Sequence, residues 1–173
     1  MKNILISIIT LLSLNTFGQF YPLEAGGVGG ISSGFTFRAY LQEDLSYEAL
    51  LSFRSQGTQF HLLRQNHQEL HLTEDGSINL VYGFGTHLGF YYSDSYTVFF
   101  QDINYGRRVF SPVLGADGFV GIEYRFHEIP LSFGLNYKPY MEVSLRQIFG
   151  INLWDFGFTF KYRFIPENEY YSY

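Results

Sequence analysis

The sequence contains no cysteine, and this absence excludes disulfide bonds, thiol catalysis, cysteine-ligated zinc and a lipid anchor on an N-terminal cysteine. Charged residues make up only 16% of the 173 residues, well below the ~25% that is usual in soluble domains. The net charge of −5 offers no basic surface, so we expect no nucleic-acid partner. After residue 18, no apolar run approaches the ~20 residues that a transmembrane helix needs, which excludes a helical inner-membrane protein.

Aromatic residues and glycine are abundant instead. Phe occurs 19 times, Tyr 15 times and Gly 18 times, while Trp occurs once. The mean hydropathy is −0.03, which is too low for a bundle of membrane helices and too high for a disordered chain. Abundant aromatics at neutral hydropathy therefore predict strands with one apolar face and one polar face.

Residues 1–18 have the composition of a secretory signal peptide. Lys2 supplies the positive start, an apolar stretch of about 11 residues follows from Ile4 to Leu14, and Gly18 supplies a small residue before the cleavage point. The apolar stretch is too short to span a membrane as a helix. We expect cleavage near Gln19, which leaves residues 19–164 as the folded domain and residues 165–173 as a short periplasmic tail.

The clearest alternation of apolar and polar residues lies between positions 154 and 164. Trp154, Phe and Tyr occupy every second position, and the residues between them are Asp155, Gly157, Thr159, Lys161 and Arg163. Side chains of a strand point alternately to opposite faces, so this segment has one aromatic face and one charged face. A helix would scatter both kinds of residue around its circumference. This segment is therefore predicted to be a strand.

Similar alternation predicts eight strands in all. They lie near residues 21–30, 34–42, 46–55, 58–70, 77–92, 112–126, 130–144 and 150–164. A soluble sandwich would bury the apolar faces, whereas a transmembrane barrel would turn them to lipid and enclose the charges. Aromatic residues near the strand ends, strands longer than the ~5–6 residues of soluble sheets and the signal peptide all favour the membrane. We therefore predict an all-β, eight-stranded, antiparallel up-and-down transmembrane barrel.

Three segments resemble a known family. The ending 154–164 resembles the C-terminal strand by which Gram-negative outer-membrane barrels are recognised for insertion. Residues 34–41, and residues 114–126 followed by Glu128-Ile-Pro-Leu131, look like small OmpA/OmpX-type barrels, especially a group of short ones without assigned function. The resemblance implies an outer-membrane location, contact with lipid and with the barrel insertion machinery, and an insertion signal formed by Phe160, Tyr162 and Phe164. It implies no catalytic residues.

Charged residues that face the interior of the predicted barrel are balanced in sign. The six acids are Glu24, Glu48, Asp117, Glu123, Glu142 and Asp155, and the six bases are Arg38, Arg54, Arg125, Lys138, Lys161 and Arg163. Unpaired charges are costly in a narrow interior, so we expect cross-strand ion pairs. Side chains just fill an eight-stranded barrel, which favours a plugged core over a small selective pore.

No residue pattern predicts an enzyme. Small outer-membrane barrels that modify lipid A use a His and a Ser near the rim with an acidic partner, and this is the alternative function that we consider. His87 and Ser93 are too far apart along one strand to form a hydrogen bond. His67 and His71 lie about 13 Å apart along one strand, too far to share one metal ion. We therefore expect no catalytic residues, no metal and no cofactor.

Two further segments bear on partners. Residues 64–69 are polar on both faces, which indicates either a periplasmic extension of the strand or a protein-facing side of the barrel in a larger assembly. Residues 93–111 form the one long connection on the predicted extracellular side. Aromatic residues and arginine dominate binding hot spots, and those in this segment are Tyr96, Phe99, Phe100, Tyr105, Arg107, Arg108 and Phe110. This segment is predicted to bind an outer-membrane partner, to fold over the barrel mouth as a lid, or to extend its strands as a hairpin.

Overall fold

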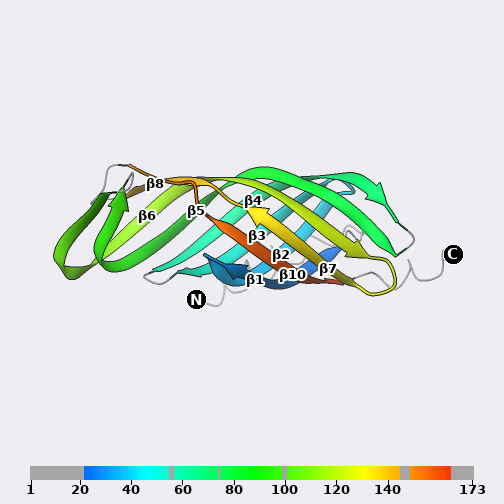
Figure 1. The fold of residues 1–173 in the computed structure, drawn as a ribbon, viewed down its shortest axis with the longest axis horizontal. Helices are drawn as coiled ribbons and strands as arrows, with labels where there is room; N and C mark the ends of the chain where they lie inside the picture. Colours follow the sequence, from blue (N-terminus) through cyan, green and yellow to red (C-terminus); the bar gives the residue numbers. More distant parts are fainter. Residues whose placement is uncertain (1–21, 55–56, 74, 99–100, 145–148, 165–173) are drawn as a thin grey trace, which may run out of the picture.

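The computed structural model describes residues 22–54, 57–73, 75–98, 101–144 and 149–164, so the predicted signal peptide and tail lie outside it. Within these ranges the chain is all-β, and no helix is long and apolar enough to cross a membrane. The strands are β1 (Leu23–Gly30), β2 (Ser33–Gln42), β3 (Leu45–Arg54), β4 (Gly57–Leu72), β5 (Gly76–Val98), β6 (Gln101–Phe126), β7 (Leu131–Tyr137), β8 (Tyr140–Ser144), β9 (Gly150–Asn152) and β10 (Phe156–Phe164) (Figure 1).

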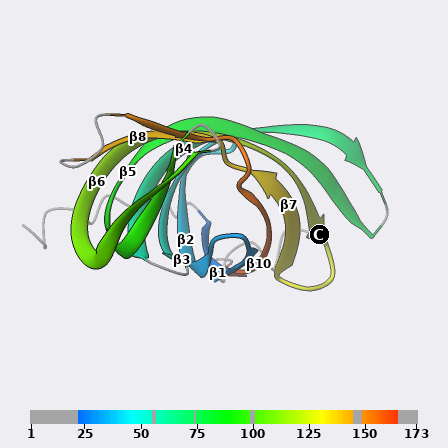
Figure 2. The same cartoon turned by 60° about the vertical axis from the view of Figure 1, so that its left-hand side comes forward.

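The strands form one closed, antiparallel barrel. Each of β1 to β6 pairs with its neighbour in sequence, β6 pairs with both β7 and β8, and β7 pairs with β10. The ring closes where β1 pairs with β10, from Leu23 opposite Phe164 to Gly30 opposite Gly157. Because β7 continues into β8 and β9 into β10, the barrel has eight strands, as predicted. Figure 2 shows them curving around a common interior.

The barrel has two distinguishable ends. The start of β1, the end of β10 and the turns β2–β3, β4–β5 and β6–β7 lie at one end, which we call the terminal end. The end of β1, the start of β4, the end of β5 and the end of β8 lie at the other, which we call the hairpin end. β1 ends at Gly30, whose φ of 134° strongly favours glycine, and a Cβ there would lie 2.5 Å from the Phe156 carbonyl oxygen.

The two strands predicted near residues 130–144 and 150–164 are each interrupted. Tyr137 lies opposite Phe156 and Tyr140 lies opposite Asn152, so two residues of one strand face the three residues 153–155 of the other. Pro139 has no N–H to donate to this pairing, while the Lys138 N–H donates to the Asp155 carbonyl over 2.8 Å. The result is a β-bulge that leaves Trp154 exposed and turns Asp155 inward.

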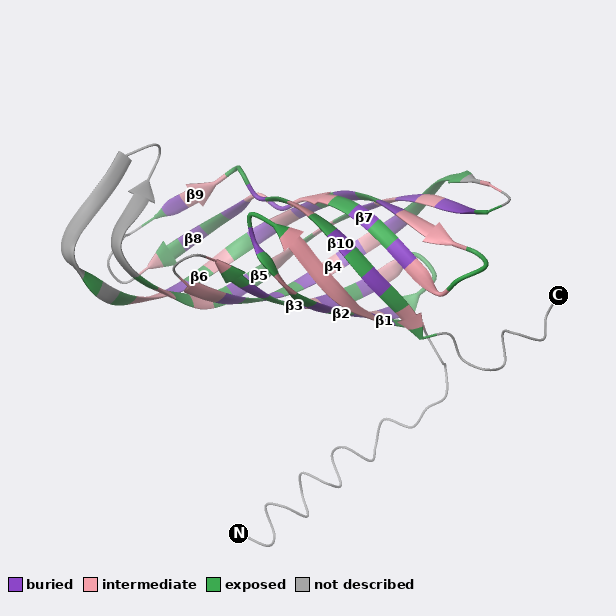
Figure 3. Cartoon of the chain, turned by 60° about the horizontal axis from the view of Figure 1, so that its bottom comes forward, coloured by how far each residue is buried: buried purple, intermediate pink, exposed green. Residues whose placement is uncertain are grey.

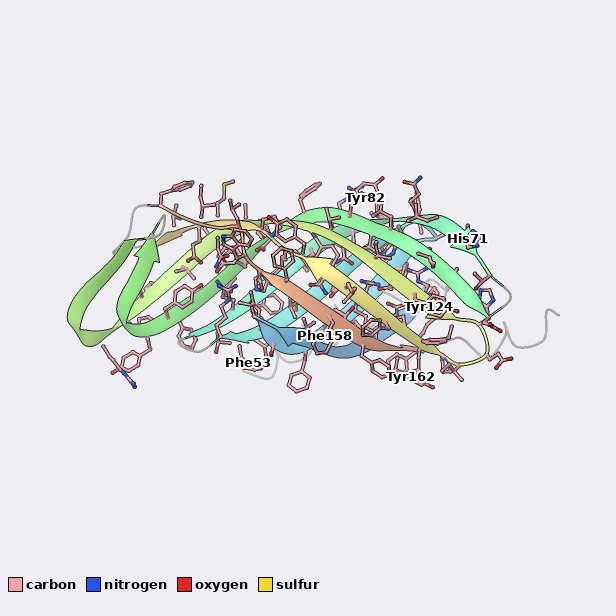
Figure 4. The ribbon with its side chains drawn as sticks, viewed as in Figure 1. Phe53, His71, Tyr82, Tyr124, Phe158 and Tyr162 are labelled. Atoms are coloured by element: carbon pink, nitrogen blue, oxygen red, sulfur yellow. The ribbon has the colours of Figure 1, made fainter. Side chains whose placement is uncertain are left out.

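Burial alternates along the strands, but here polar residues are buried and apolar residues are exposed, the reverse of a water-soluble protein. Figure 3 shows buried and exposed positions following one another along most of the described strands. Among the described residues, the buried set is mainly polar or charged, and its only cluster of apolar side chains consists of Leu63, Val81 and Phe119. The exposed set is rich in Phe, Leu and Tyr, and Figure 4 shows Phe53, Phe158 and Tyr162 pointing away from the barrel.

The segment 93–111 extends its two strands beyond the barrel. β4 begins at Gly57, opposite Tyr91, whereas β5 and β6 continue together beyond this level, from Ser95 opposite Asn104 to Val98 opposite Gln101. This hairpin is the projection at the left of Figure 1. Its backbone therefore corresponds to the predicted hairpin extension rather than to a lid. A register shift between Ser93 and Ser95 marks where the hairpin leaves the regular barrel.

Strand β4 likewise runs beyond its neighbour at the terminal end. Asn66 lies opposite Leu45, the first residue of β3, and the His67 N–H donates to the Asp44 carbonyl over 2.8 Å. From Gln68 onward, β4 pairs with β5 alone. Gln68 and Glu69 of the polar segment 64–69 therefore extend beyond β3, and the periplasmic location of this extension stays a prediction.

Candidate functional site

The interior of the barrel, its lumen, holds all twelve charged residues that alternation assigns to it. Nine of them are buried, and the side chains of Arg54, Arg125 and Arg163 are 13%, 16% and 23% exposed. The lumen also holds three buried histidines that alternation alone did not assign to a site: His61, His67 and His87. These groups form two clusters, one toward each end of the barrel.

The cluster toward the terminal end is centred on Arg38. Its guanidinium lies 3.0 Å from Glu24, 2.8 Å from Glu48 and 2.7 Å from Glu123, so it joins carboxylates from three strands. The surrounding contacts are Lys161–Glu48 at 3.0 Å, Arg125–Glu123 at 2.9 Å and Arg163–Glu24 at 3.4 Å. We call these seven residues the Arg38 cluster. Each buried carboxylate has a cationic partner, as a low-dielectric interior requires.

The cluster toward the hairpin end is centred on His87. Its Nδ1 lies 2.9 Å from Asp117 Oδ1, and its Nε2 lies 3.3 Å from Glu142 Oε2. The ring packs against Gly115, where a Cβ would lie only 2.3 Å from His87 Cε1, so glycine is needed there for this packing. His87 therefore links two carboxylates without any arginine or lysine between them.

His61 extends this cluster on the neighbouring strand. Its Nδ1 lies 3.1 Å from Asp117 Oδ2, and its Nε2 lies 3.0 Å from Ser52 Oγ and 3.2 Å from Lys138 Nζ. Lys138 and Arg54 in turn approach Asp155, at 3.6 and 3.1 Å. The His87 cluster is defined as Ser52, Arg54, His61, His87, Asp117, Lys138, Glu142 and Asp155.

Ser52, His61 and Asp117 have the spacing of a serine–histidine–aspartate triad. The two contacts of 3.0 and 3.1 Å match those of a nucleophile, a base and an orienting carboxylate. However, Ser52 is 1% exposed, and Lys138 Nζ competes for the same ring nitrogen. A nucleophile needs a position about 3 Å away where a substrate atom can lie. The described structure has the triad spacing without access for a substrate.

Cavities beside these clusters are small. One of about 10 Å³ lies between them, with Glu48 on one side and Lys138 and Asp155 on the other. A second of about 10 Å³ lies beside Arg38 and Glu123. Each has room for about one water molecule. Polar and apolar side chains together thus fill these parts of the lumen.

The residues predicted to form the insertion signal and the partner-binding loop do not lie in the lumen. Some are exposed on the outer surface, and the side chains of the others are outside what the structure describes. Phe160, Tyr162 and Phe164 are exposed on β10, and the Tyr162 and Phe164 rings lie 5.0 Å apart. In the hairpin, Arg108 and Phe110 are exposed, and the Phe110 ring lies 5.5 Å from that of Phe90. The side chains of Tyr96, Phe99, Phe100, Tyr105 and Arg107 lie outside what the structure describes.

The histidine contacts depend on cross-strand register, which sequence reasoning did not use. His61 lies opposite His87 on adjacent strands, although the two are far apart in the sequence. His67 bonds to Ser46 Oγ at 2.7 Å and to Arg125 at 2.9 Å, while His71 is exposed. Comparing histidines within one strand could not find these pairs. Alternation applied to every histidine would have placed His61 and His87 in the lumen. It would not have shown that they lie opposite each other on adjacent strands.

Comparisons with known proteins add no assignment. No family model matches the sequence, and no curated protein and no solved structure matches it. What is known of this site therefore comes from its own residues and geometry.

Proposed function

We propose that this protein is an outer-membrane β-barrel of a Gram-negative bacterium, similar to the small OmpA/OmpX-type barrels. The observation that carries the proposal is the reversed polarity of the barrel, whose outer surface is apolar and whose lumen is charged. In water, such an outer surface would be a very large apolar patch, whereas a lipid bilayer covers it. Tyr47, Tyr82, Tyr124 and Tyr162, all in the half of the barrel nearer the terminal end, supply the aromatic girdle that membrane barrels place at an interface.

Insertion tests this location. Phe164→Asp places a charge in the exposed aromatic row of β10, and we expect the amount of protein in the outer membrane to fall. The matched control is Ile129→Asp, which changes an apolar residue of similar exposure (44% against 51%) in the β6–β7 turn, outside the strands. Quantitative immunoblots of separated membranes measure both variants. Equal outer-membrane levels for the two variants would contradict an insertion signal at Phe164.

Within the membrane, the proposed role is structural or partner-binding, without catalysis and without ion conduction. The ion pairs that fill the Arg38 cluster support a closed lumen. In planar bilayers, the purified barrel is expected to give no stable single-channel steps. Reproducible conductance steps would refute the closed lumen.

The hairpin of β5 and β6 is the proposed partner-binding element, and the proposed partners are other outer-membrane proteins. It projects beyond the barrel, and Arg108 and Phe110 at its base are exposed. Replacing residues 95–109 with a short Gly/Ser linker should leave a barrel that still migrates differently on SDS gels before and after boiling. Proteins that co-purify with the intact chain from mild-detergent extracts should then be lost. If these proteins still co-purify, they do not bind through the hairpin, and the polar segment 64–69 becomes the favoured binding surface.

The alternative function, a lipid A-modifying hydrolase or acyltransferase, is favoured by one observation, the triad spacing of Ser52, His61 and Asp117. The experiment that separates the two functions is mass spectrometry of lipid A from cells with the intact chain and with Ser52→Ala. The non-enzymatic proposal expects identical masses. A mass change that Ser52→Ala abolishes would replace it with the enzymatic one.

A further inference from the structure

Three adjacent strands, β4, β5 and β6, bring together in the lumen three side chains of types that can bind a metal ion. His61 on β4 lies directly opposite His87 on β5, and their ring centroids are 5.0 Å apart. Asp117 on β6 lies opposite Gly85, two residues from His87 along β5. Paired residues on adjacent strands have Cβ atoms about 4.5–5.5 Å apart, which is suitable for ligands of one ion. The register of the barrel, rather than any sequence motif, creates this arrangement.

The ligand atoms of these three residues converge. One ring nitrogen from each histidine and one carboxylate oxygen of Asp117 all lie within 4.8 Å of one another, and all three side chains are buried. The nitrogens that face the carboxylate are His61 Nδ1 at 3.1 Å and His87 Nδ1 at 2.9 Å. Two imidazoles and one carboxylate form a ligand set typical of zinc sites with three protein ligands.

The second nitrogen of each ring already has a suitable outer partner. His87 Nε2 lies 3.3 Å from Glu142, and His61 Nε2 lies 3.0 Å from Ser52 Oγ. Metal-bound histidines usually donate their other N–H to a carboxylate, carbonyl or water, which orients the ring and raises its basicity. Glu142 and Ser52 can accept these two hydrogen bonds.

We propose that His61, His87 and Asp117 bind one divalent transition-metal ion of the zinc class through both Nδ1 atoms and the carboxylate. Imidazole and carboxylate together suit Zn²⁺, whereas Mg²⁺ and Ca²⁺ prefer sites built of oxygen alone. The inference does not depend on the membrane location or on the role of the hairpin, because it uses only the lumen.

Binding requires a defined movement of protons. Without metal, the Nδ1–H groups of both rings donate to Asp117. On binding, the His61 proton moves to Nε2 and is donated to Ser52, while His87, which carries a proton on both nitrogens without metal, releases its Nδ1 proton to the solvent and keeps the Nε2–H that it donates to Glu142. Lys138, whose Nζ lies 3.2 Å from His61 Nε2, then turns toward Asp155, which it already approaches at 3.6 Å. The ring nitrogens that do not bind the metal, His61 Nε2 and His87 Nε2, thus keep Ser52 and Glu142 as partners.

The test uses the full-length barrel, unfolded in urea with a chelator and refolded in detergent with Zn²⁺ or Co²⁺, so that no entry path into the folded lumen is needed. Heat modifiability on SDS gels reports folding for each variant. The proposal expects one equivalent of Zn²⁺ after desalting and the visible absorption of tetrahedral Co²⁺. His61→Gln and His87→Gln should lose both signals, and Glu142→Gln should weaken the affinity about 10- to 100-fold.

The matched control is His67→Gln, which changes the third buried histidine of the lumen, outside the site. This variant should bind Zn²⁺ and Co²⁺ as the intact chain does. Folded intact barrel without bound metal would overturn the proposal and leave a hydrogen-bond network only. Equal loss of metal in His67→Gln and His87→Gln would overturn it as well, because the metal would then lie elsewhere.

Discussion

The two lumenal clusters differ in the cations that neutralise their carboxylates. In the Arg38 cluster, arginine and lysine surround Glu24, Glu48 and Glu123. In the His87 cluster, imidazoles contact Asp117 and Glu142, and the only fixed cations, Arg54 and Lys138, approach Asp155. Arginine remains charged at every accessible pH, whereas a histidine can lose its proton or bind a metal. The Arg38 cluster is thus suited to closing the barrel, and the His87 cluster to exchanging a cation.

The largest expected effect follows from removing the central arginine. Arg38→Met leaves three buried carboxylates without their shared partner, and breaking a buried ion pair in this way costs about 3–5 kcal/mol. The control is Arg64→Met, because Arg64 stacks over Phe84 on the outer surface and contacts no carboxylate in the described residues. Urea titrations followed by the fluorescence of the single Trp measure both variants. Equal urea midpoints for Arg38→Met and Arg64→Met would show that the ion pairs of Arg38 do not stabilise the barrel.

A smaller effect is expected from displacing His87 without changing any charged residue. In Gly115→Ala the new methyl would overlap the His87 ring, 2.3 Å from Cε1, and the Met141 carbonyl oxygen at 2.4 Å. Overpacking of this kind costs about 1–3 kcal/mol. Gly118→Ala on the same strand is the control, because its methyl would meet Pro139 at an ordinary 3.4 Å. The same titration should show a lower midpoint for Gly115→Ala than for Gly118→Ala, and the reverse order would show that His87 tolerates displacement.

Alternation along single strands was sufficient to predict the barrel and the inward charges. It assigns each side chain to a face, and Glu24 and Lys161 lie in the lumen as their positions require. It does not determine which residues of neighbouring strands lie opposite one another. That register depends on turn lengths and on irregularities such as the bulge opposite Lys138 and Pro139. The convergence of His61, His87 and Asp117 is a consequence of register, so single-strand reasoning could not find it.

The smallest expected difference lies between two serine–histidine pairs, each formed by a serine on β3 and a histidine on β4. Ser46 bonds to His67 Nε2 at 2.7 Å beside the Arg38 cluster. Ser52 bonds to His61 Nε2 at 3.0 Å within the His87 cluster. Arg125 donates to His67 Nδ1, so His67 must carry its proton on Nε2 and donate it to Ser46. Asp117 accepts from His61 Nδ1, so His61 Nε2 is an acceptor that Lys138 also reaches, at 3.2 Å. The two histidines therefore depend on their serines to different degrees.

Ser46→Ala leaves a buried N–H donor without a partner among the described residues, which costs about 1–3 kcal/mol. Ser52→Ala leaves an acceptor that still receives a hydrogen bond from Lys138, so we expect a loss below about 1 kcal/mol. Urea midpoints of the two variants, measured in one detergent without added metal, test this order. If Ser52→Ala is the more destabilising change, Lys138 does not satisfy His61, and the lysine would have to be assigned to Asp155 even in the metal-free barrel.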